Sequence, residues 1–229
     1  MTPILTIDGP GGAGKGTVSK RLAREFGWHL LDSGALYRLV GVAARKHGTD
    51  FENVTELAEI ARNLDVEFRV SEEEELVQTW LEGMRADHLL RAETAGSDAS
   101  VVAAIPEVRT ALLERQRAFA EPPGLVADGR DMGTVVFPDA ALKVFLTASA
   151  EERAKRRYKQ LMEQGLSANL RALQEEMETR DRRDRERPTA PLKPAEDAWI
   201  LDCTGIGIES VVAMIRERLL VVLSGQELH

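Results

Sequence analysis

The feature that most constrains this chain is a run of glycines around a single lysine at residues 9–17, GPGGAGKGT. It follows the apolar segment ILTI and precedes TVSKRLAREFG, in which Val18, Leu22 and Phe26 recur at the spacing of one helix face. Glycine weakens a regular helix or strand, so a cluster of five glycines indicates a loop with unusual backbone angles or a close approach by another group. The sequence therefore predicts a strand, a glycine loop and a helix in direct succession.

The spacing of this run fits the phosphate loop G-x-x-x-x-G-K, with Gly9, Gly14 and Lys15 in register. In such a loop, successive backbone N–H groups and the positive end of the following helix surround a polyphosphate, while the lysine reaches the outer phosphates. A flexible glycine turn without a ligand is the alternative that this context disfavours. The predicted ATP-binding residues of the loop are Gly9, Pro10, Gly11, Gly12, Ala13, Gly14, Lys15, Gly16 and Thr17.

The residue after the lysine departs from the general motif. That motif places Ser or Thr directly after the lysine to hold Mg²⁺, whereas here Gly16 intervenes and Thr17 follows. Thr17 is therefore the predicted metal ligand. The variant GKGT is typical of nucleoside monophosphate kinases.

Composition limits the class of protein further. A chain of 229 residues with 43% hydrophobic residues suffices for one large domain that carries a smaller insert. The net charge of −8 disfavours a general nucleic-acid binder, although residues 153–187 are locally basic and favour a small anionic ligand. The single Cys203 excludes an intramolecular disulfide and is expected in the core. No leader-like or membrane-spanning apolar segment is found, so a cytoplasmic location without membrane contact is expected.

The middle of the chain differs from its flanks. Three runs, VEFRV, LVQTWL and MRADHLL, alternate in the manner of strands and are joined by the short connections SEEEE and EG. Such short connections join antiparallel strands, so an antiparallel insert is predicted at about residues 64–92. Outside it, apolar runs alternate with helical patterns, which predicts a parallel sheet with crossover helices.

Five blocks extend the resemblance beyond the phosphate loop: DGPGGAGKGT, LLDSGALYR, ADGRDMGTVVFPDA, SAEERAKRR and RDRRDRERPTAPL. In this order they resemble the bacterial cytidylate kinase family. The resemblance implies an α/β, three-layer P-loop kinase fold with a five-stranded parallel sheet, an antiparallel NMP-binding insert and a short helical lid. It divides the chain into a core, residues 1–32 and 106–229 with the lid at about 150–170, and an NMP-binding region, residues 33–105.

The same resemblance implies an activity. The family transfers the γ-phosphoryl group of ATP to CMP or dCMP with Mg²⁺, by in-line displacement. The expected partners are these small molecules alone, and the expected state is a monomer. A kinase for UMP, AMP or shikimate is the nearest alternative. A P-loop nucleotide switch is disfavoured because the guanine-recognising N-K-x-D is absent.

The resemblance also assigns roles to individual residues. For the acceptor it implies phosphate contacts by Arg38, Arg130 and Arg187, a lining of Ser33 and Tyr37, base contacts by Ser100, Arg109 and Asp131, and ribose contacts by Arg180 and Asp184. For ATP it implies the lid arginines Arg153, Arg156 and Arg157. The expected catalytic residues are Lys15, Arg130, Arg187 and Asp128. Arginine suits phosphate binding because its planar guanidinium group can donate hydrogen bonds to two phosphate oxygens at once.

Two of these assignments have alternatives within the sequence. The run RDRRDRER also fits a solvated helix face, but residues 180, 184 and 187 share one helical side, so Arg182, Arg183 and Arg185 are expected at the surface. Asp128 ends an apolar run, from which a P-loop enzyme often supplies a carboxylate to Mg²⁺ or water. Asp8 is a weaker candidate for that role, and a structural hydrogen bond is an equal alternative for both aspartates.

Overall fold

A computed structural model describes residues 2–70, 77–163 and 165–225 of the chain. The chain divides into two compact units, Met1–Asp32 with Gln116–His229, and Ser33–Arg115. Helix α6 (Pro106–Arg117) crosses the division between these units, and the predicted domain bounds stay a prediction. Each unit is described in turn.

The first unit is built on a five-stranded parallel sheet with the strand order β2-β6-β1-β7-β8. Its strands are β1 (Ile4–Asp8), β2 (His29–Asp32), β6 (Leu125–Gly129), β7 (Leu142–Thr147) and β8 (Trp199–Asp202). All five residues of β6 are buried, as expected of a central strand in a sheet covered on both faces. The chain runs from β1 toward one edge and later returns to the other, so the strand order reverses at β1. Ligands of such sheets bind at the carboxyl ends of the strands at this point.

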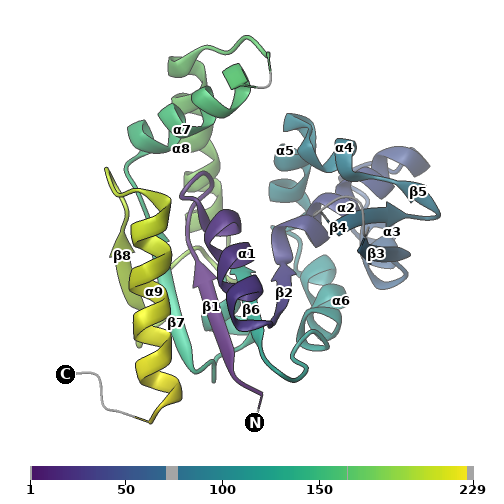
Figure 1. Cartoon of the computed structure of the whole chain (residues 1–229). Helices are drawn as coiled ribbons and strands as arrows, with labels where there is room; N and C mark the ends of the chain where they lie inside the picture. The colour runs from purple at the N-terminus through teal and green to yellow at the C-terminus, as the bar shows by residue number, and fades with distance from the viewer. Residues whose placement is uncertain (1, 71–76, 164, 226–229) are drawn as a thin grey trace. The chain divides into compact units, whose positions relative to one another are not determined.

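The helices of the first unit are α1 (Lys15–Phe26), α7 (Ala150–Glu163), α8 (Leu170–Glu186) and α9 (Ile208–Leu223). Figure 1 shows α1 and α9 side by side over the sheet, and buried side chains of both helices join those of β1 and β7 in the main core. Helices α7 and α8 pack against each other around Ala154, Leu161 and Leu173. Cys203 belongs to the main core, as predicted.

The second unit contains α2 (Ser33–His47), α3 (Val54–Arg62), α4 (Asp87–Arg91) and α5 (Glu93–Val102), together with most of α6. Its antiparallel sheet consists of β3 (Val66–Val70), β4 (Val77–Leu81) and β5 (Met84–Arg85). Glu82 and Gly83 join β4 to β5 with positive φ angles of 49° and 73°. Two successive positive φ angles define the type I′ turn that matches the twist of a hairpin. The predicted antiparallel insert is therefore present.

One predicted strand is wrong. The run MRADHLL forms only the two-residue β5 and then the helix α4. At the start of α4 the Asp87 carboxylate accepts a hydrogen bond from the Thr79 backbone N–H at 2.9 Å, a contact across the turn between β4 and β5 that the alternation of the run does not predict. The connection SEEEE lies outside the described residues.

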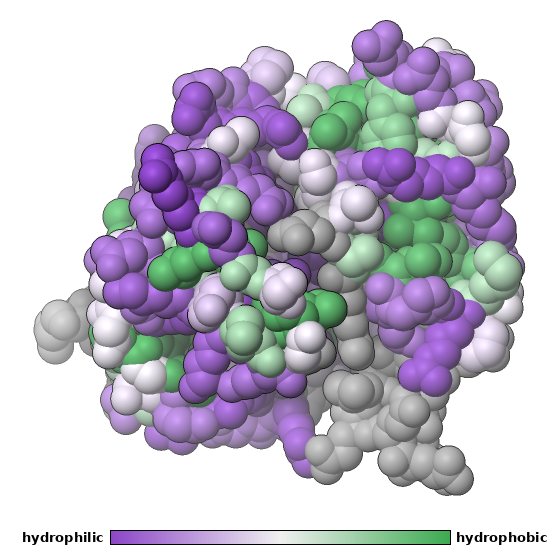
Figure 2. All heavy atoms as spheres, turned by 90° about the horizontal axis from the view of Figure 1, so that it is seen from above, coloured by the Kyte–Doolittle hydropathy of each residue, from purple (hydrophilic) through white to green (hydrophobic). Residues whose placement is uncertain are grey.

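The observed architecture confirms the predicted fold class, an α/β chain with a five-stranded parallel sheet and a small antiparallel one. Viewed from above in Figure 2, hydrophilic side chains cover most of the surface, and apolar side chains gather in smaller patches. Within the part of the chain that is described, no helix is both long enough and apolar enough to span a bilayer.

Candidate active site

The glycine loop connects β1 to α1 at the carboxyl end of the central strand. A Cβ atom on Gly9 would lie only 1.9 Å from the backbone oxygen of Leu146 in β7, and Gly9 has a φ of +149°. Gly14, which caps the N-terminus of α1, has a φ of +94°. Side chains are strained at both positions, so these glycines are needed for the path of the loop.

Lys15 is the first residue of α1, and its side chain is buried beside the loop. Its ammonium group donates a hydrogen bond to the backbone oxygen of Pro10 at 3.0 Å and lies 3.9 Å from the Asp128 carboxylate. Burial, together with the positive charge of Arg130, lowers the pKa of Lys15 to about 8. The charge of this lysine is therefore costly in the free protein and would be favoured by an anionic ligand.

Two acidic residues lie at the carboxyl ends of adjacent strands, Asp8 on β1 and Asp128 on β6. The Asp8 carboxylate accepts hydrogen bonds from the backbone N–H groups of Met132 and Gly133, both at 2.8 Å. These bonds anchor a short π-helical turn, η1 (Met132–Val136). Burial raises the pKa of Asp8 to about 7, although the two N–H groups act in the opposite direction. Asp8 thus has a structural partner.

Asp128 has a different environment from Asp8. Its side chain lies beside the loop, because a Cβ on Gly16 would be 3.5 Å from its Oδ2. No set of three or more His, Cys, Asp or Glu suited to a metal ion occurs among the described residues. Mg²⁺ is usually held by one or two protein oxygens, water and substrate phosphates. Asp128 is a carboxylate of that kind beside the loop, and the predicted role of Thr17 as a metal ligand stays a prediction.

Two arginines, Arg130 and Arg180, lie beside the loop. A Cβ on Gly11 would lie 3.6 Å from Arg130 Nη2 and 3.9 Å from Arg180 Nη1. Arg130 donates to Asp184 at 3.0 Å. Burial raises the pKa of Asp184, but the charges of Arg130, Arg180 and Arg187 outweigh burial and hold it below the ordinary value. The structure therefore brings these predicted residues together around an ionised carboxylate.

Arg187 lies at the C-terminal end of α8, with its guanidinium 3.7 Å from the Asp131 carboxylate. Both side chains are buried. By contrast, Arg182, Arg183 and Arg185 are exposed, as the helical spacing predicted. The run RDRRDRER thus combines a buried side and a solvated side.

The three predicted lid arginines, all on α7, have different environments. Arg153 is buried and donates to the backbone oxygens of Ala148 and Gly11 and to Asp181. Arg156 donates to the Cys203 backbone oxygen at 2.7 Å and to Ala13 at 3.4 Å. Its pKa is raised: burial lowers the value, but contacts with Cys203 and Glu152 outweigh it.

Arg157 donates to Gln160 one turn further along α7. Unlike Arg153 and Arg156, it has no contact with the loop among the hydrogen bonds of the described residues. Its predicted contact with ATP stays a prediction.

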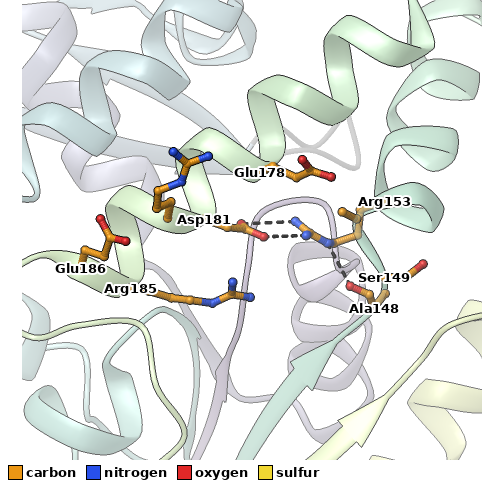
Figure 3. Close-up of a pocket in the computed structure, with 9 residues that line it drawn as sticks. Ala148, Ser149, Arg153, Glu178, Asp181, Arg185 and Glu186 are labelled. Carbon is orange, nitrogen blue, oxygen red and sulfur yellow. Dashed lines mark hydrogen bonds and ion pairs between the residues drawn. The ribbon is translucent and has the colours of Figure 1, made fainter.

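A polar pocket of about 450 Å³ lies between the start of α7 and α8. Figure 3 shows Arg153 and Asp181 pointing toward each other across this pocket, with Glu178, Arg185 and Glu186 also on α8. Asp181 is a site residue that the sequence analysis missed. It was masked by the surrounding charges of the run, and its partner is 28 positions away in the sequence.

The remaining predicted acceptor residues lie in the second unit. Ser33, Tyr37 and Ser100 are buried there, and Arg38 is half-buried on α2. The Arg109 guanidinium lies 5.7 Å from the centre of the Tyr37 ring and donates to the Ala103 backbone oxygen at 3.3 Å. Tyr37 and Arg109 thus form one contact cluster on α2 and α6.

Comparisons with known proteins agree on one family. The family model described as Cytidylate kinase matches residues 5–220. A cytidylate kinase of Pseudomonas entomophila (strain L48) is 58% identical to this chain over 96% of both lengths. A cytidylate kinase of Stutzerimonas stutzeri (strain A1501) is 58% identical over 93% of both lengths.

A solved structure supports the fold alone. It is titled as an uncharacterized protein from Eubacterium ventriosum ATCC 27560 and superposes with a TM-score of 0.53 at 11% identity. The match covers 96% of this chain and 98% of the other.

Proposed function

Because the chain belongs to the cytidylate kinase family, we propose that it transfers the γ-phosphoryl group of Mg·ATP to CMP and dCMP, giving CDP and dCDP. The observation that supports this most directly is the phosphate loop with buried Lys15 and the neighbouring Arg130 and Arg180. A cluster of cations beside a glycine loop suits phosphorylated substrates. Pyrimidine nucleotide metabolism is the corresponding role.

The loop and α1 are proposed to bind the phosphates of ATP. Lys15 would balance charge on the outer phosphates, since its ammonium group already lies beside the loop. Arg156 and Arg157 stay predicted ATP contacts on the lid. Arg156 is the better supported of the two because it contacts the loop residue Ala13.

For the acceptor, we propose the residue roles that membership of the family implies. Arg38, Arg130 and Arg187 would bind the CMP phosphate beside Ser33 and Tyr37, and Arg180 and Asp184 would contact the ribose. Ser100, Arg109 and Asp131 would contact the base. A carboxylate such as Asp131 accepts from the amino group of cytosine but repels the carbonyl of uracil. The low pKa of Asp184 supports an acceptor role, because an ionised carboxylate accepts hydrogen bonds from ribose hydroxyls.

In the proposed mechanism the protein positions the substrates and stabilises charge, and it forms no covalent bond with them. The CMP phosphate is largely ionised at neutral pH, so its oxygen can attack without a general base. Lys15, the loop N–H groups and Arg130 and Arg187 would stabilise the charge that spreads over the transferred group. Bound Mg²⁺, held by Thr17 with Asp128 nearby, would neutralise charge on the ATP phosphates.

A coupled assay with Mg·ATP and each of CMP, dCMP, UMP and AMP tests the proposal. We expect turnover with CMP and dCMP and much weaker turnover with the other two. Failure with all four would overturn the kinase proposal. If Arg109→Met and Asp131→Ala leave CMP turnover unchanged while Arg130→Ala abolishes it, the proposed base contacts are wrong.

The proposed functional form is a cytoplasmic monomer that has no nucleic-acid or membrane partner. Light scattering with and without nucleotides would test the monomer. A dimer that persists at assay concentrations would contradict it.

A further inference from the structure

We propose that Asp181 is a positioning residue for ATP. It acts through Arg153, which holds the backbone oxygen of Gly11 and so orients the next peptide N–H, that of Gly12, toward the phosphates. This inference rests on the proposed binding of ATP at the glycine loop, and it concerns how that loop keeps its shape.

The Arg153 guanidinium connects three segments of the first unit. Its Nη1 donates to the Gly11 oxygen at 2.8 Å, and its Nε donates to the Ala148 oxygen at the end of β7 at 3.0 Å. Its other contact is a two-pronged ion pair with Asp181 on α8, at 2.5 and 3.3 Å. Figure 3 shows the pair with the connection to Ala148. One side chain thereby ties the loop to both a strand and a helix.

Burial makes this arrangement rigid. The side chains of Arg153 and Asp181 are only 3% and 5% exposed. A buried arginine without a carboxylate partner is strongly disfavoured, so Asp181 is what allows Arg153 to remain at this place. The backbone of Gly12 packs closely against α7 as well, because a Cβ there would lie 3.2 Å from the Cβ of Arg153.

The geometry of the peptide between Gly11 and Gly12 connects the Arg153 hydrogen bond to the ligand. A trans peptide is planar, with its C=O and its N–H on opposite sides. Holding the Gly11 oxygen toward Arg153 therefore turns the Gly12 N–H away from Arg153. Gly11 itself faces the guanidinium groups of Arg130, which is proposed to bind the CMP phosphate, and of Arg180. The loop N–H is thus fixed before the ligand arrives, and such preorganisation increases affinity.

Removing the charge of Asp181 tests the proposal, because the direction of the change in ATP affinity depends on the role of Arg153. If Arg153 bound ATP phosphates directly, Asp181 would compete with ATP for it, and removing the carboxylate charge would strengthen ATP binding. If Asp181 positions Arg153, the same change weakens ATP binding, although it removes a negative charge near a polyanion. The two roles therefore predict opposite changes in the affinity for ATP when the charge of Asp181 is removed.

The experiment measures binding of the non-hydrolysable β,γ-imido analogue of ATP with Mg²⁺ by calorimetry. It also measures KM and kcat for CMP phosphorylation. We expect Asp181→Asn to weaken the analogue and raise KM for ATP by about tenfold or more, with kcat and KM for CMP little changed. Glu178→Gln is the matched control, because this exposed carboxylate lines the same pocket on the same helix. It should leave ATP binding as in the unmodified protein.

A second variant separates positioning from folding. Arg153→Met combined with Asp181→Leu removes both charges and refills the site with apolar groups, which proteins often tolerate well. It should remain folded by circular dichroism and still bind the analogue weakly, because nothing holds the Gly11 oxygen.

Unchanged or tighter analogue binding by Asp181→Asn would overturn the inference, as would full affinity of the folded double variant. Measurements on the unmodified protein distinguish failure of this inference from failure of the proposed function. If it neither binds the analogue nor phosphorylates CMP, the proposed function itself fails.

Discussion

At the residue scale, the site is defined by charges brought together before any ligand is present. Lys15 is buried beside Arg130 and Arg180, and both burial and their charges lower its pKa. The compensating anions nearby are Asp128 and Asp8. This arrangement is unfavourable in the free protein and favourable with a polyphosphate, which is the difference expected of a phosphate site.

The pKa of Lys15 gives a prediction for pH. Because a lysine with a pKa of about 8 loses its charge as pH rises through that value, we expect kcat/KM for ATP to fall above about pH 8. Bound phosphates raise this pKa, so kcat should hold to higher pH. Initial rates from about pH 6 to pH 10 measure both, and Lys15→Arg, which keeps its charge, should abolish the fall. A profile that is the same for Lys15→Arg and the unmodified protein would contradict the assignment.

Gly9 gives a prediction for stability. Gly9→Ala would place a methyl group 1.9 Å from the Leu146 oxygen, so we expect a loss of about 3 kcal/mol or more in the free energy of unfolding. Gly27→Ala is the control at the other end of α1, where φ is +64° and no atom lies within 4 Å. It should cost only about 1 kcal/mol. Urea denaturation measures both variants, and equal losses would refute the steric explanation.

At the element scale, α8 carries two different faces. One side presents Asp181, Asp184 and, at its end, Arg187, all buried, whereas Arg182, Arg183 and Arg185 on the other side are exposed. The pattern has helical spacing, so one element serves both the loop and the solvent. The charge run therefore has one buried side and one exposed side.

Two substitutions on this run test its two faces. Arg187→Met removes a cation that lies 3.7 Å from Asp131, and we expect kcat/KM for CMP to fall by about a hundredfold or more. Arg183→Met changes the same residue type one turn earlier, where the side chain is exposed, and should stay within about twofold. Steady-state kinetics over CMP concentration compares them. Similar losses in both variants would mean that the overall charge of the run matters rather than its buried face.

The elements also show what local sequence can predict. The strand, loop and helix around residues 9–17 were predictable because glycine spacing and apolar periodicity are local signals. Features that depend on contacts distant in sequence were not predictable. The π-helical turn η1 depends on Asp8, which is 124 positions from Met132, and the role of Asp181 depends on Arg153.

At the scale of the whole molecule, the predicted site residues divide between two compact units. The phosphate loop and the arginines of residues 130–187 belong to the first unit, and Ser33, Tyr37, Arg38, Ser100 and Arg109 belong to the second. The resemblance in the sequence could assign these residues to one reaction. Helix α6 is continuous across the division at Arg115, so periodicity along the sequence carries no signal of that division.

Hydrogen exchange tests which residues bind each nucleotide. We expect the ATP analogue to slow amide exchange mainly at residues 9–17, because it orders the loop N–H groups. CMP alone should slow exchange in α2 and α5 of the second unit and around Arg130. Mass spectrometry of peptic fragments measures both patterns, with UMP as the control for base contacts. Protection by CMP that is confined to the first unit would contradict an acceptor role for residues 33–115.

The crowding of Lys15, Arg130 and Arg180 has a consequence for directed evolution of this protein. Variants selected only for heat resistance in the absence of nucleotide should gain a neutral side chain in place of Lys15, because that change removes a buried cation from beside Arg130 and Arg180, which are themselves paired with Asp184. The same variants would lose catalytic turnover. A search for a more robust enzyme should therefore keep both nucleotides present during heating, so that selection acts on the liganded form.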